Sequence, residues 1–382
     1  MPSIREGAQH GDVRPTPIFI VGNVHSGTTL LQNVISNHPD VFSGQGESAF
    51  FHHLPTIRRQ FADLNDAATL QRFVVFLLKI ILVGYNKVNF GTAQTMAADF
   101  RAWGIDQTQV DQLIMLAQQN RHHVKLFVLV NEYLAALDTK QFWLEKTPGH
   151  IHQLEQILRT CLTARVIEMV RDPRDILASK QARRSAAWLA QTTAAAGDYL
   201  HLMGGFDPVW DTMSWKAAVQ AGMSAQVRYP DQIRRVRYED FVAAPQAELA
   251  AICHFLGLAV DAARLEAMVA VDWRNTTTQK MPGAQGIGTN SVGKWQTQLP
   301  PETVALCQWL TKREASALNY IPGKVPLLST LKVPFLLMHS GVELWQRMRR
   351  RWHLGGNLYL LTQFQNYRTR LFNLWHSRTA KG

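Results

Sequence analysis

Short, largely apolar runs alternate along this chain with longer segments in which apolar residues recur every three or four positions. The runs Ile18–Val21 and Arg165–Val170 predict buried parallel strands. Further strands are predicted at Val41–Ser43, Phe142–Leu144 and Ile233–Arg237. Helices are predicted over about Thr28–Asn37, 150–161, 211–228 and 245–256, and from Asp172-Pro173 onward. Strands that alternate with helices predict an α/β fold with a central parallel sheet flanked by helices.

The same pattern divides the chain into three parts. Residues 1–16 form an N-terminal arm, which has no hydrophobic region of signal-peptide length. Residues 17–320 form the main domain. Within it, residues 55–140 are predicted to be a helical insertion, which either shapes a second binding wall or serves only for packing. Residues 321–382 form a C-terminal extension.

Charge is distributed unevenly between these parts. The chain of 382 residues has a formal net charge of +11, and residues 321–382 hold ten Lys/Arg and one acid, Glu343. The extension therefore carries +9, which leaves +2 for the first 320 residues. A nearly neutral main domain argues against a nucleic-acid enzyme and against nucleic acid as a partner.

Cysteine and hydropathy patterns indicate the compartment. Cys161, Cys253 and Cys307 are far apart in apolar patterns, which fits neither a disulfide framework nor a zinc site and suits a reducing environment. The most apolar stretch, Phe73–Tyr85, is interrupted by Lys79 and is shorter than the about 20 residues that span a bilayer. A cytoplasmic protein is expected, with a peripheral position on a membrane as the alternative.

The first strand leads into a glycine loop that is suited to an anion. Gly22 and Gly27 have the spacing of a P-loop, and a helix follows at once. Backbone N–H groups of such a loop and the positive end of the helix dipole attract phosphate. Thr28, however, stands where a nucleotide triphosphatase needs its lysine. The loop is therefore expected to hold a phosphorylated donor other than ATP, without Mg²⁺ or another metal.

A second cluster of polar residues follows the strand that ends at Val170. Arg171 lies at the carboxyl end of this strand, where α/β sheets place their ligands, and Ser179 lies two helical turns further on. Arg183 shares a helix face with Ser179. A cation and a hydroxyl could thus face one phosphate. The alternative is a surface ion-pair cluster within Arg171–Asp175, worth about 0–1 kcal/mol per pair.

These two motifs resemble those of the sulfotransferases that use 3′-phosphoadenosine 5′-phosphosulfate (PAPS). The first is Ser26-Gly27-Thr28-Thr29 after a strand, and the second is the pair Arg171 and Ser179. Looser likeness to the bacterial and tyrosylprotein-type branch is found at His38-Pro39, Glu47, Lys146 in EKTP, Tyr238-Glu239, and Ser291, Lys294 and Trp295 in SVGKWQ. The resemblance covers roughly residues 17–320. It implies transfer of a sulfuryl group from PAPS to an acceptor hydroxyl, or secondarily an amine, with adenosine 3′,5′-bisphosphate (PAP) as product.

The resemblance also implies roles for individual residues. Ser26, Gly27, Thr28 and Thr29 would cradle the 5′-phosphosulfate, and Arg171 and Ser179 would grip the 3′-phosphate. Arg183 and Tyr238 would complete this pocket, with Ser291, Gly293 and Lys294 closing over the donor. Lys146 would reach the transferring group; otherwise it is a solvated lysine at a strand end.

The resemblance points to Glu47 as the general base that takes the acceptor's proton. The other interpretation of Glu47 is a glutamate that starts a helix. Relatives with a histidine base leave five further candidates: His52, His53, His122, His123 and His150.

One position departs from the family pattern. Arg or Lys usually precedes SGTT, and this chain has His25. An imidazole beside an anion can be held protonated, or it can donate one hydrogen bond while neutral. Either form supports a leaving group less firmly than a permanent cation does. The other interpretation is that His25 only packs in the loop and that Lys146 is the active cation.

The extension combines basic and apolar residues. From Asn357 to about Arg378, apolar residues recur at helical spacing, and Arg347–Trp352 is strongly basic. Such a segment is typical of a helix on a membrane surface, or of one docked on the enzyme with a solvated basic face.

The acceptor is expected to carry a hydroxyl and to be hydrophobic. The alternative functions are a P-loop kinase-like phosphotransferase and a non-catalytic nucleotide-binding membrane adaptor.

Overall fold

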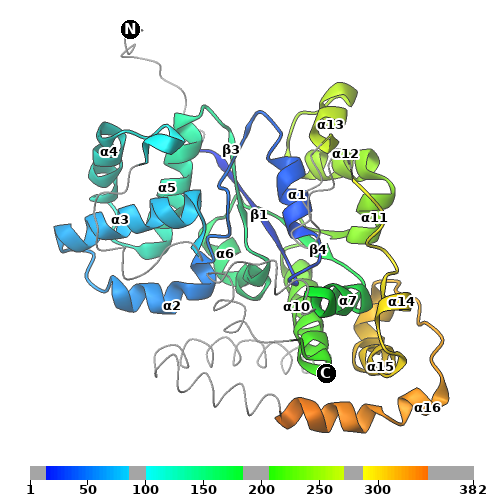
Figure 1. Ribbon diagram of the computed structural model, residues 1–382. Helices are drawn as coiled ribbons and strands as arrows, with labels where there is room; N and C mark the ends of the chain where they lie inside the picture. The colour runs from blue at the N-terminus through cyan, green and yellow to red at the C-terminus, as the bar shows by residue number, and fades with distance from the viewer. Residues whose placement is uncertain (1–13, 86–99, 184–205, 271–286, 343–382) are drawn as a thin grey trace.

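The computed structural model describes residues 14–85, 100–183, 206–270 and 287–342. Its centre is a five-stranded parallel sheet in the order β2-β3-β1-β4-β5, with helices on both faces (Figure 1). The strands are β1 (Thr16–Gly22), β2 (Val41–Ser43), β3 (Phe142–Lys146), β4 (Arg165–Val170) and β5 (Ile233–Arg237). All pairs are parallel, so the carboxyl ends of the strands meet at one edge. The predicted fold class is confirmed.

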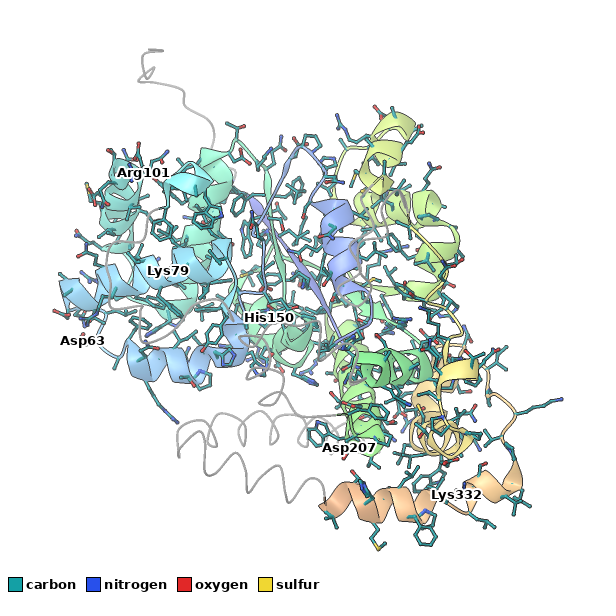
Figure 2. The ribbon with its side chains drawn as sticks, in the orientation of Figure 1. Asp63, Lys79, Arg101, His150, Asp207 and Lys332 are labelled. Carbon is teal, nitrogen blue, oxygen red and sulfur yellow. The ribbon has the colours of Figure 1, made fainter. Side chains whose placement is uncertain are left out.

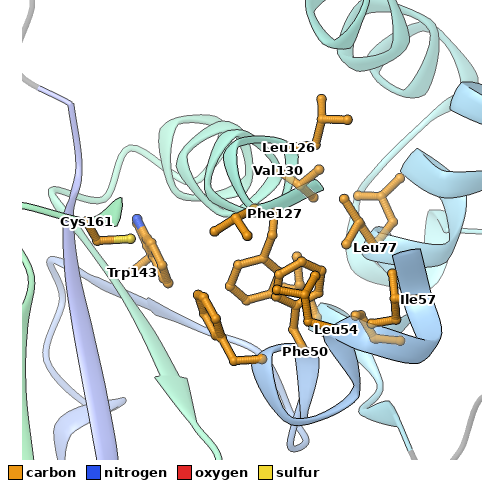
Figure 3. Close-up of a cluster of buried hydrophobic side chains, with 14 of the residues drawn as sticks. Phe50, Leu54, Ile57, Leu77, Leu126, Phe127, Val130, Trp143 and Cys161 are labelled. Carbon is orange, nitrogen blue, oxygen red and sulfur yellow. The ribbon is translucent and has the colours of Figure 1, made fainter. Parts of the chain in front are cut away.

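Side chains alternate between the two faces of the sheet. Ile18, Ile20, Ile167 and Met169 point to one face, where α1, α11, α12 and α13 cover them. Phe19, Val21, Trp143 and Val166 point to the other face and belong to a larger cluster built mainly by α2 to α6 and α10. Figure 3 shows part of this cluster, with Phe50, Phe127 and Trp143 packed between α2, α5 and β3. Both faces of the sheet are therefore buried.

The helices occupy most of the chain between these strands. The α-helices around the sheet are α1 (Thr28–Ile35), α2 (Phe50–Gln60), α3 (Ala67–Leu82), α4 (Gln107–Ala117), α5 (His123–Leu137), α6 (Leu154–Thr160), α7 (Pro173–Arg183), α10 (Pro208–Arg228), α11 (Tyr238–Ala243), α12 (Pro245–Leu256) and α13 (Ala262–Val269). The later α-helices are α14 (Trp295–Gln298), α15 (Pro301–Ala317) and α16 (Leu327–Thr330), and short 3₁₀ helices lie at η2 (Arg101–Trp103) and η3 (Pro148–Gln153).

Two predicted boundaries change for physical reasons. β3 extends two residues beyond the predicted strand, because Glu145 and Lys146 pair with Phe19 and Ile20 of β1. The helix predicted over 150–161 begins as the 3₁₀ helix η3, in which the N–H of His150 bonds the carbonyl of Thr147, and α6 follows. The other predicted strands and helices agree within a few residues with the observed ones.

The predicted insertion is largely helical in its described part. α3, α4 and α5 pack on one another and on α2, to the left of the sheet in Figure 1. Asp66 caps α3, and Asp106 forms a capping box with Gln109 at the start of α4. No helix in the described ranges is long and apolar enough to cross a bilayer. The predicted amphipathic helix at 357–378 lies outside the described residues.

Candidate functional site

The glycine loop after β1 requires its glycines. Gly27 has φ 97°, and a Cβ at this position would overlap the ring of Tyr238. Gly22 has φ 151°, and a Cβ there would overlap the carbonyl oxygen of Met169 in β4. Ser26 is fully buried, and its hydroxyl donates to the carbonyl of Asn23 at 2.7 Å. The side chain of Ser26 therefore shapes the loop from within, so the loop's contacts to an anion fall to its backbone.

The start of α1 supplies donors for that anion. Gly27 is the N-cap of α1 and makes no side-chain cap bond. The first N–H groups of a helix have no partner inside the helix, so those of Thr28 and Thr29 are available to a ligand. Thr28 is buried, and Thr29 is partly exposed. Arg171 adds a third donor, because its Nε is buried without a hydrogen-bond partner in the described structure. This donor set suits an anionic phosphate ester.

Lys146 connects the loop to the predicted base. Its Nζ donates to Thr29 Oγ1 at 3.2 Å and to Glu47 Oε1 at 2.7 Å. Only 4% of Lys146 is exposed, which excludes the interpretation of a solvated lysine. Glu47 lies before α2, whose N-cap is Ala49, so it does not start a helix. The structure thus brings together three predicted residues from α1, the loop after β2 and the end of β3.

The loop that carries Glu47 is held by the insertion. Gly44 and Gly46 pack against the end of α3, where a Cβ on Gly46 would lie 2.6 Å from the carbonyl oxygen of Val83. The N–H of Gln45 bonds the carbonyl of Leu82, and the N–H of Tyr85 bonds the carbonyl of Glu47. The position of the Glu47 backbone therefore depends on α3.

The buried carboxylate of Glu145 holds the start of α2 in place. Glu145 accepts hydrogen bonds from Ser48 Oγ at 2.6 Å and Thr147 Oγ1 at 2.7 Å. His150 Nδ1 lies 2.9 Å from Glu145, and His150 Nε2 accepts the N–H of Phe51. Burial would raise the pKa of Glu145, but His150 and these hydroxyl groups hold it below its ordinary value. Figure 2 labels His150 beneath the sheet.

The contacts of the five candidate histidines affect whether each of them could act as the general base. Both ring nitrogens of His150 are engaged, one with Glu145 and one with a backbone N–H. His53 stacks on Tyr85 with ring centroids 4.0 Å apart. Burial, and secondarily the nearby His150, lowers the pKa of His53 to about 4. His123 contacts the carbonyl of Phe61, and burial lowers the pKa of His122. His52 lies in α2 next to His53, with ring centroids 4.8 Å apart.

The second motif meets the first at His25. This residue adopts the left-handed conformation, with φ 73°. Arg171 Nη1 donates to the carbonyl of His25 at 3.1 Å, and Ser179 Oγ lies 3.3 Å from His25 Nδ1. The guanidinium of Arg171 also lies over the ring of Tyr238, 4.5 Å from its centroid. Arg171, Ser179 and Tyr238 therefore surround the glycine loop. Burial raises the pKa of Tyr238.

The remaining residues of the Arg171–Asp175 cluster are buried, so the interpretation as a surface ion-pair cluster is wrong. Arg174 forms a 2.6 Å ion pair with Asp172 and stacks on Trp295 at 4.0 Å. Arg174 also donates to the carbonyl of Ile321 and to Gln308. The cluster binds α7 to the later part of the chain.

The segment that precedes α14 is attached to the same cluster. The carboxylate of Asp175 accepts the N–H groups of Gly293 at 2.8 Å and Trp295 at 3.0 Å. Arg171 Nη2 donates to the carbonyl of Ser291. Lys294 is the N-cap of α14 and is partly exposed. The structure therefore places Ser291 against Arg171 and Gly293 against Asp175, and Lys294 lies between Gly293 and Trp295 in the same segment. Arg183 is the last residue of α7, and its side chain lies outside the described part of the structure.

The glycine loop, Lys146 and Arg171 lie at the carboxyl ends of β1, β3 and β4, and a family comparison covers the same region. The model of the sulfotransferase family matches residues 17–262, which include the glycine loop, Glu47, Lys146, Arg171 and Tyr238. The chain belongs to the sulfotransferase family. It is a PAPS-dependent enzyme that transfers a sulfuryl group. Neither alternative, a P-loop kinase or a non-catalytic adaptor, is favoured by this match.

Solved sulfotransferase structures also resemble this chain. The sulfotransferase domain of the Synechococcus PCC 7002 olefin synthase is 20% identical over 84% of this chain and 100% of that domain, with a TM-score of 0.48. The sulfotransferase domain of the curacin biosynthetic pathway is 17% identical over 82% of this chain and 99% of that domain, with a TM-score of 0.48. Sulfotransferase STF9 from Mycobacterium avium is 14% identical over 82% of this chain and 79% of that protein, with a TM-score of 0.42. No curated protein sequence matches. The assignment rests on the family model.

Several residues that organise this site were given no role in the sequence analysis. Asp175, Glu145 and Glu239 hold loops through backbone or hydroxyl groups, and Glu239 accepts the N–H of Asp172 and the hydroxyl of Tyr320. The alternation of acids and bases in Arg171–Asp175 signals such a network, but the partners are distant in sequence. In the described residues, no group of three or more His, Cys, Asp or Glu side chains is placed to hold a metal ion.

Proposed function

We propose that this sulfotransferase acts on an acceptor hydroxyl, with Glu47 as general base and Lys146 as the cation at the transferring group. The supporting observation is the position of Lys146 Nζ, which contacts both Thr29 of the anion-binding helix and Glu47. The donor and the acceptor would therefore meet at one ammonium group. An amine acceptor is the second choice.

The donor side of the proposal uses the glycine loop and the Arg171 cluster. The N–H groups of Thr28 and Thr29 and the loop backbone would hold the 5′-phosphosulfate. Arg171 and Ser179 would bind the 3′-phosphate, next to Tyr238, Ser291, Gly293 and Lys294, with Arg183 following on α7. During transfer, negative charge builds on the departing phosphate oxygen. Donors fixed beside that oxygen stabilise the transition state more than the ground state.

His25 has a positioning role in this proposal. Its carbonyl accepts from Arg171, and its ring contacts Ser179. It therefore holds the two proposed 3′-phosphate ligands against the loop. Lys146, whose Nζ donates to Thr29 Oγ1, takes the cationic role that Arg or Lys before SGTT has in the family.

The acceptor side favours Glu47 over histidine. A base must reach the acceptor hydroxyl by a hydrogen bond, and Glu47 is partly exposed beside Lys146. His150 has both ring nitrogens engaged, and the ring of His53 is stacked on Tyr85. The apolar helices of the insertion lie next to the Glu47 loop, which supports a hydrophobic acceptor. Contact between the basic extension, residues 321–382, and a membrane surface would bring such an acceptor to the enzyme.

Calorimetric titration with PAP, compared with ATP plus Mg²⁺, tests the donor side. The enzyme is expected to bind PAP and not ATP–Mg²⁺. Ser179→Ala should weaken PAP binding about tenfold, and Arg171→Met about 10- to 100-fold, because hydrogen bonds to charged groups contribute about 1.5–3 kcal/mol. The matched control is Arg159→Met, since Arg159 is exposed and pairs with Glu155.

Two results would contradict the proposal. One is tight binding of ATP–Mg²⁺ without binding of PAP. The other is unchanged PAP affinity in Ser179→Ala, a variant that removes one hydroxyl and is expected to fold. Arg171 is buried between two carbonyl groups, so loss of PAP binding in Arg171→Met counts only if circular dichroism shows a folded protein.

A further inference from the structure

Large apolar side chains are exposed at one edge of the molecule, near the end of the described chain. Residues 333–342 are helical, and α16 comes just before them. Leu331, Phe335, Met338 and Val342 are 66%, 67%, 66% and 52% exposed. Their spacing of four, three and four residues places them along one side of a helix. These four residues are called the outer stripe below, and Leu327 and Leu328 in α16 are also exposed.

The opposite side of this helix is fixed to the protein. Val333 is buried in a cluster with Ala305 and Leu306 of α15, and Leu336 packs against that cluster. The hydroxyl of Ser340 donates to the carboxylate of Asp207, 2.8 Å from both oxygens. Figure 2 labels Asp207 above this helix and Lys332 at its start. The outer stripe is therefore exposed on a helix that already has a packed inner face.

Such a stripe is unusual for a protein surface in water. A helix docked on a domain normally turns polar residues outward, and contiguous apolar patches mark interaction sites. Here both sides of the helix are apolar. Burial of the outer stripe against something else would therefore be favourable.

The charge around the outer stripe indicates what kind of partner would bind there. Lys324 and Lys332 are exposed in this region; Lys332 pairs with Glu302 at 3.8 Å, and Asp207 is buried on the inner side of the helix. The whole extension carries ten Lys/Arg and one acid. A second copy of this chain would bring positive charge against positive charge. A bilayer with anionic headgroups offers apolar depth and opposite charge together.

We infer that the outer stripe inserts into the interface of a membrane that contains anionic lipid, with Lys324 and Lys332 at the headgroups. This inference rests on the proposed membrane contact of the extension and names the face and the lipid class. The face that would contact the membrane is formed by α16 and residues 333–342. It does not include Lys146 or Arg171. Membrane binding and donor binding can therefore be measured separately.

The test is co-sedimentation of the full-length protein with vesicles of phosphatidylcholine alone or with added phosphatidylserine. The protein should bind the vesicles that contain phosphatidylserine. Leu331→Asp/Phe335→Asp should weaken this binding at least about tenfold, because each apolar side chain contributes more than a kcal/mol on burial. Lys332→Gln should weaken it about fivefold. The matched control is Leu162→Asp/Val227→Asp, which changes two side chains that are 78% and 83% exposed elsewhere.

The outcomes separate the inference from the proposed function. Loss of vesicle binding in the stripe variant, with PAP affinity and the control unchanged, supports it. Equal binding by the stripe variant and the wild type overturns it, since another part of the chain would then hold the membrane. Absence of wild-type binding to vesicles, or a dimer that the stripe variant converts to a monomer, also overturns it. In each of these cases the affinity for PAP is expected to stay the same. Failure of the proposed function, in contrast, would abolish PAP binding and leave vesicle binding intact.

Discussion

At the scale of single residues, the ammonium group of Lys146 lies between a hydroxyl and a carboxylate. Thr29 belongs to the helix that would hold the donor, and Glu47 belongs to the loop that would face the acceptor. Lys146 is almost fully buried, so its charge is screened little by solvent. The ion pair also keeps Glu47 oriented toward the donor side before an acceptor arrives.

Substitution of this pair should affect turnover more than donor binding. Glu47→Gln is expected to lower kcat about 10²- to 10⁴-fold, because an amide cannot take the proton from the acceptor. Lys146→Met is expected to lower kcat about 10²- to 10³-fold through loss of charge stabilisation. Steady-state kinetics with a hydroxyl acceptor, together with PAP titration, measure both effects. Glu155→Gln, at a partly exposed carboxylate of α6, is the control.

A full turnover number in Glu47→Gln would rule out Glu47 as the base. An equal loss of kcat and of PAP affinity in that variant would indicate collapse of the site, and not removal of a proton acceptor.

The residues of the proposed donor site could be picked out from the sequence because their signal is local. Strand, glycine loop and helix follow one another within residues 16–35, and Arg171 and Ser179 are eight residues apart on one strand–helix unit. Lys146 and Glu47 were each predicted only through resemblance, and their ion pair was not predicted, since the two residues are 99 positions apart. Asp175 could not be assigned, because its partners Gly293 and Trp295 offer only backbone N–H groups, which every residue has.

At the scale of secondary-structure elements, α3 and the loop after β2 form one unit. The loop contributes two glycines that permit close approach, and α3 contributes carbonyl groups at its end. The helical nature of α3 could be predicted from its apolar spacing. Its contact with the loop could not, since the sequence pattern does not specify which helix end meets which loop.

A methyl group at Gly46 should displace the proposed base. The added Cβ would lie 2.6 Å from the carbonyl oxygen of Val83 and 2.7 Å from Cα of Gly84, so the loop must move. Gly46→Ala is expected to lower kcat by about 100-fold, since a shift of about 1 Å in a catalytic group has that effect. PAP affinity should stay unchanged, because the loop is not among the proposed donor ligands.

The comparison for this variant is Gly149→Ala. A Cβ at Gly149 would meet Nδ1 of His52 at 3.8 Å, which is an ordinary contact. Wild-type kcat in both variants would show that the fit between α3 and the loop does not position the base.

At the scale of the whole molecule, stability should depend on pH through the packing of the insertion. His53 lies in α2 and stacks on Tyr85, which follows α3. Its pKa is about 4 in the folded protein and about 6.5 in the unfolded chain. The unfolded chain therefore binds more protons below pH 6.5, and the folded state loses stability as the pH falls from about 6.5 to 4.

The variant His53→Phe keeps the aromatic stack and removes this titration. Between pH 7 and pH 5, the wild type should lose about 2 kcal/mol more unfolding free energy than the variant. Urea unfolding followed by circular dichroism at both pH values measures the difference. The same pH dependence in both proteins would show that His53 is not the group responsible.

The order of the strands has a consequence for how such an enzyme diversifies. On the proposed function, β1, β4 and β5 carry the ligands of the nucleotide, while β2, β3 and the helices packed on them carry the face toward the acceptor. The two halves share few residues, chiefly Lys146 and Thr29. New acceptors could thus be accommodated by exchange of the segment between β2 and β3, without any change in the half that would hold the nucleotide.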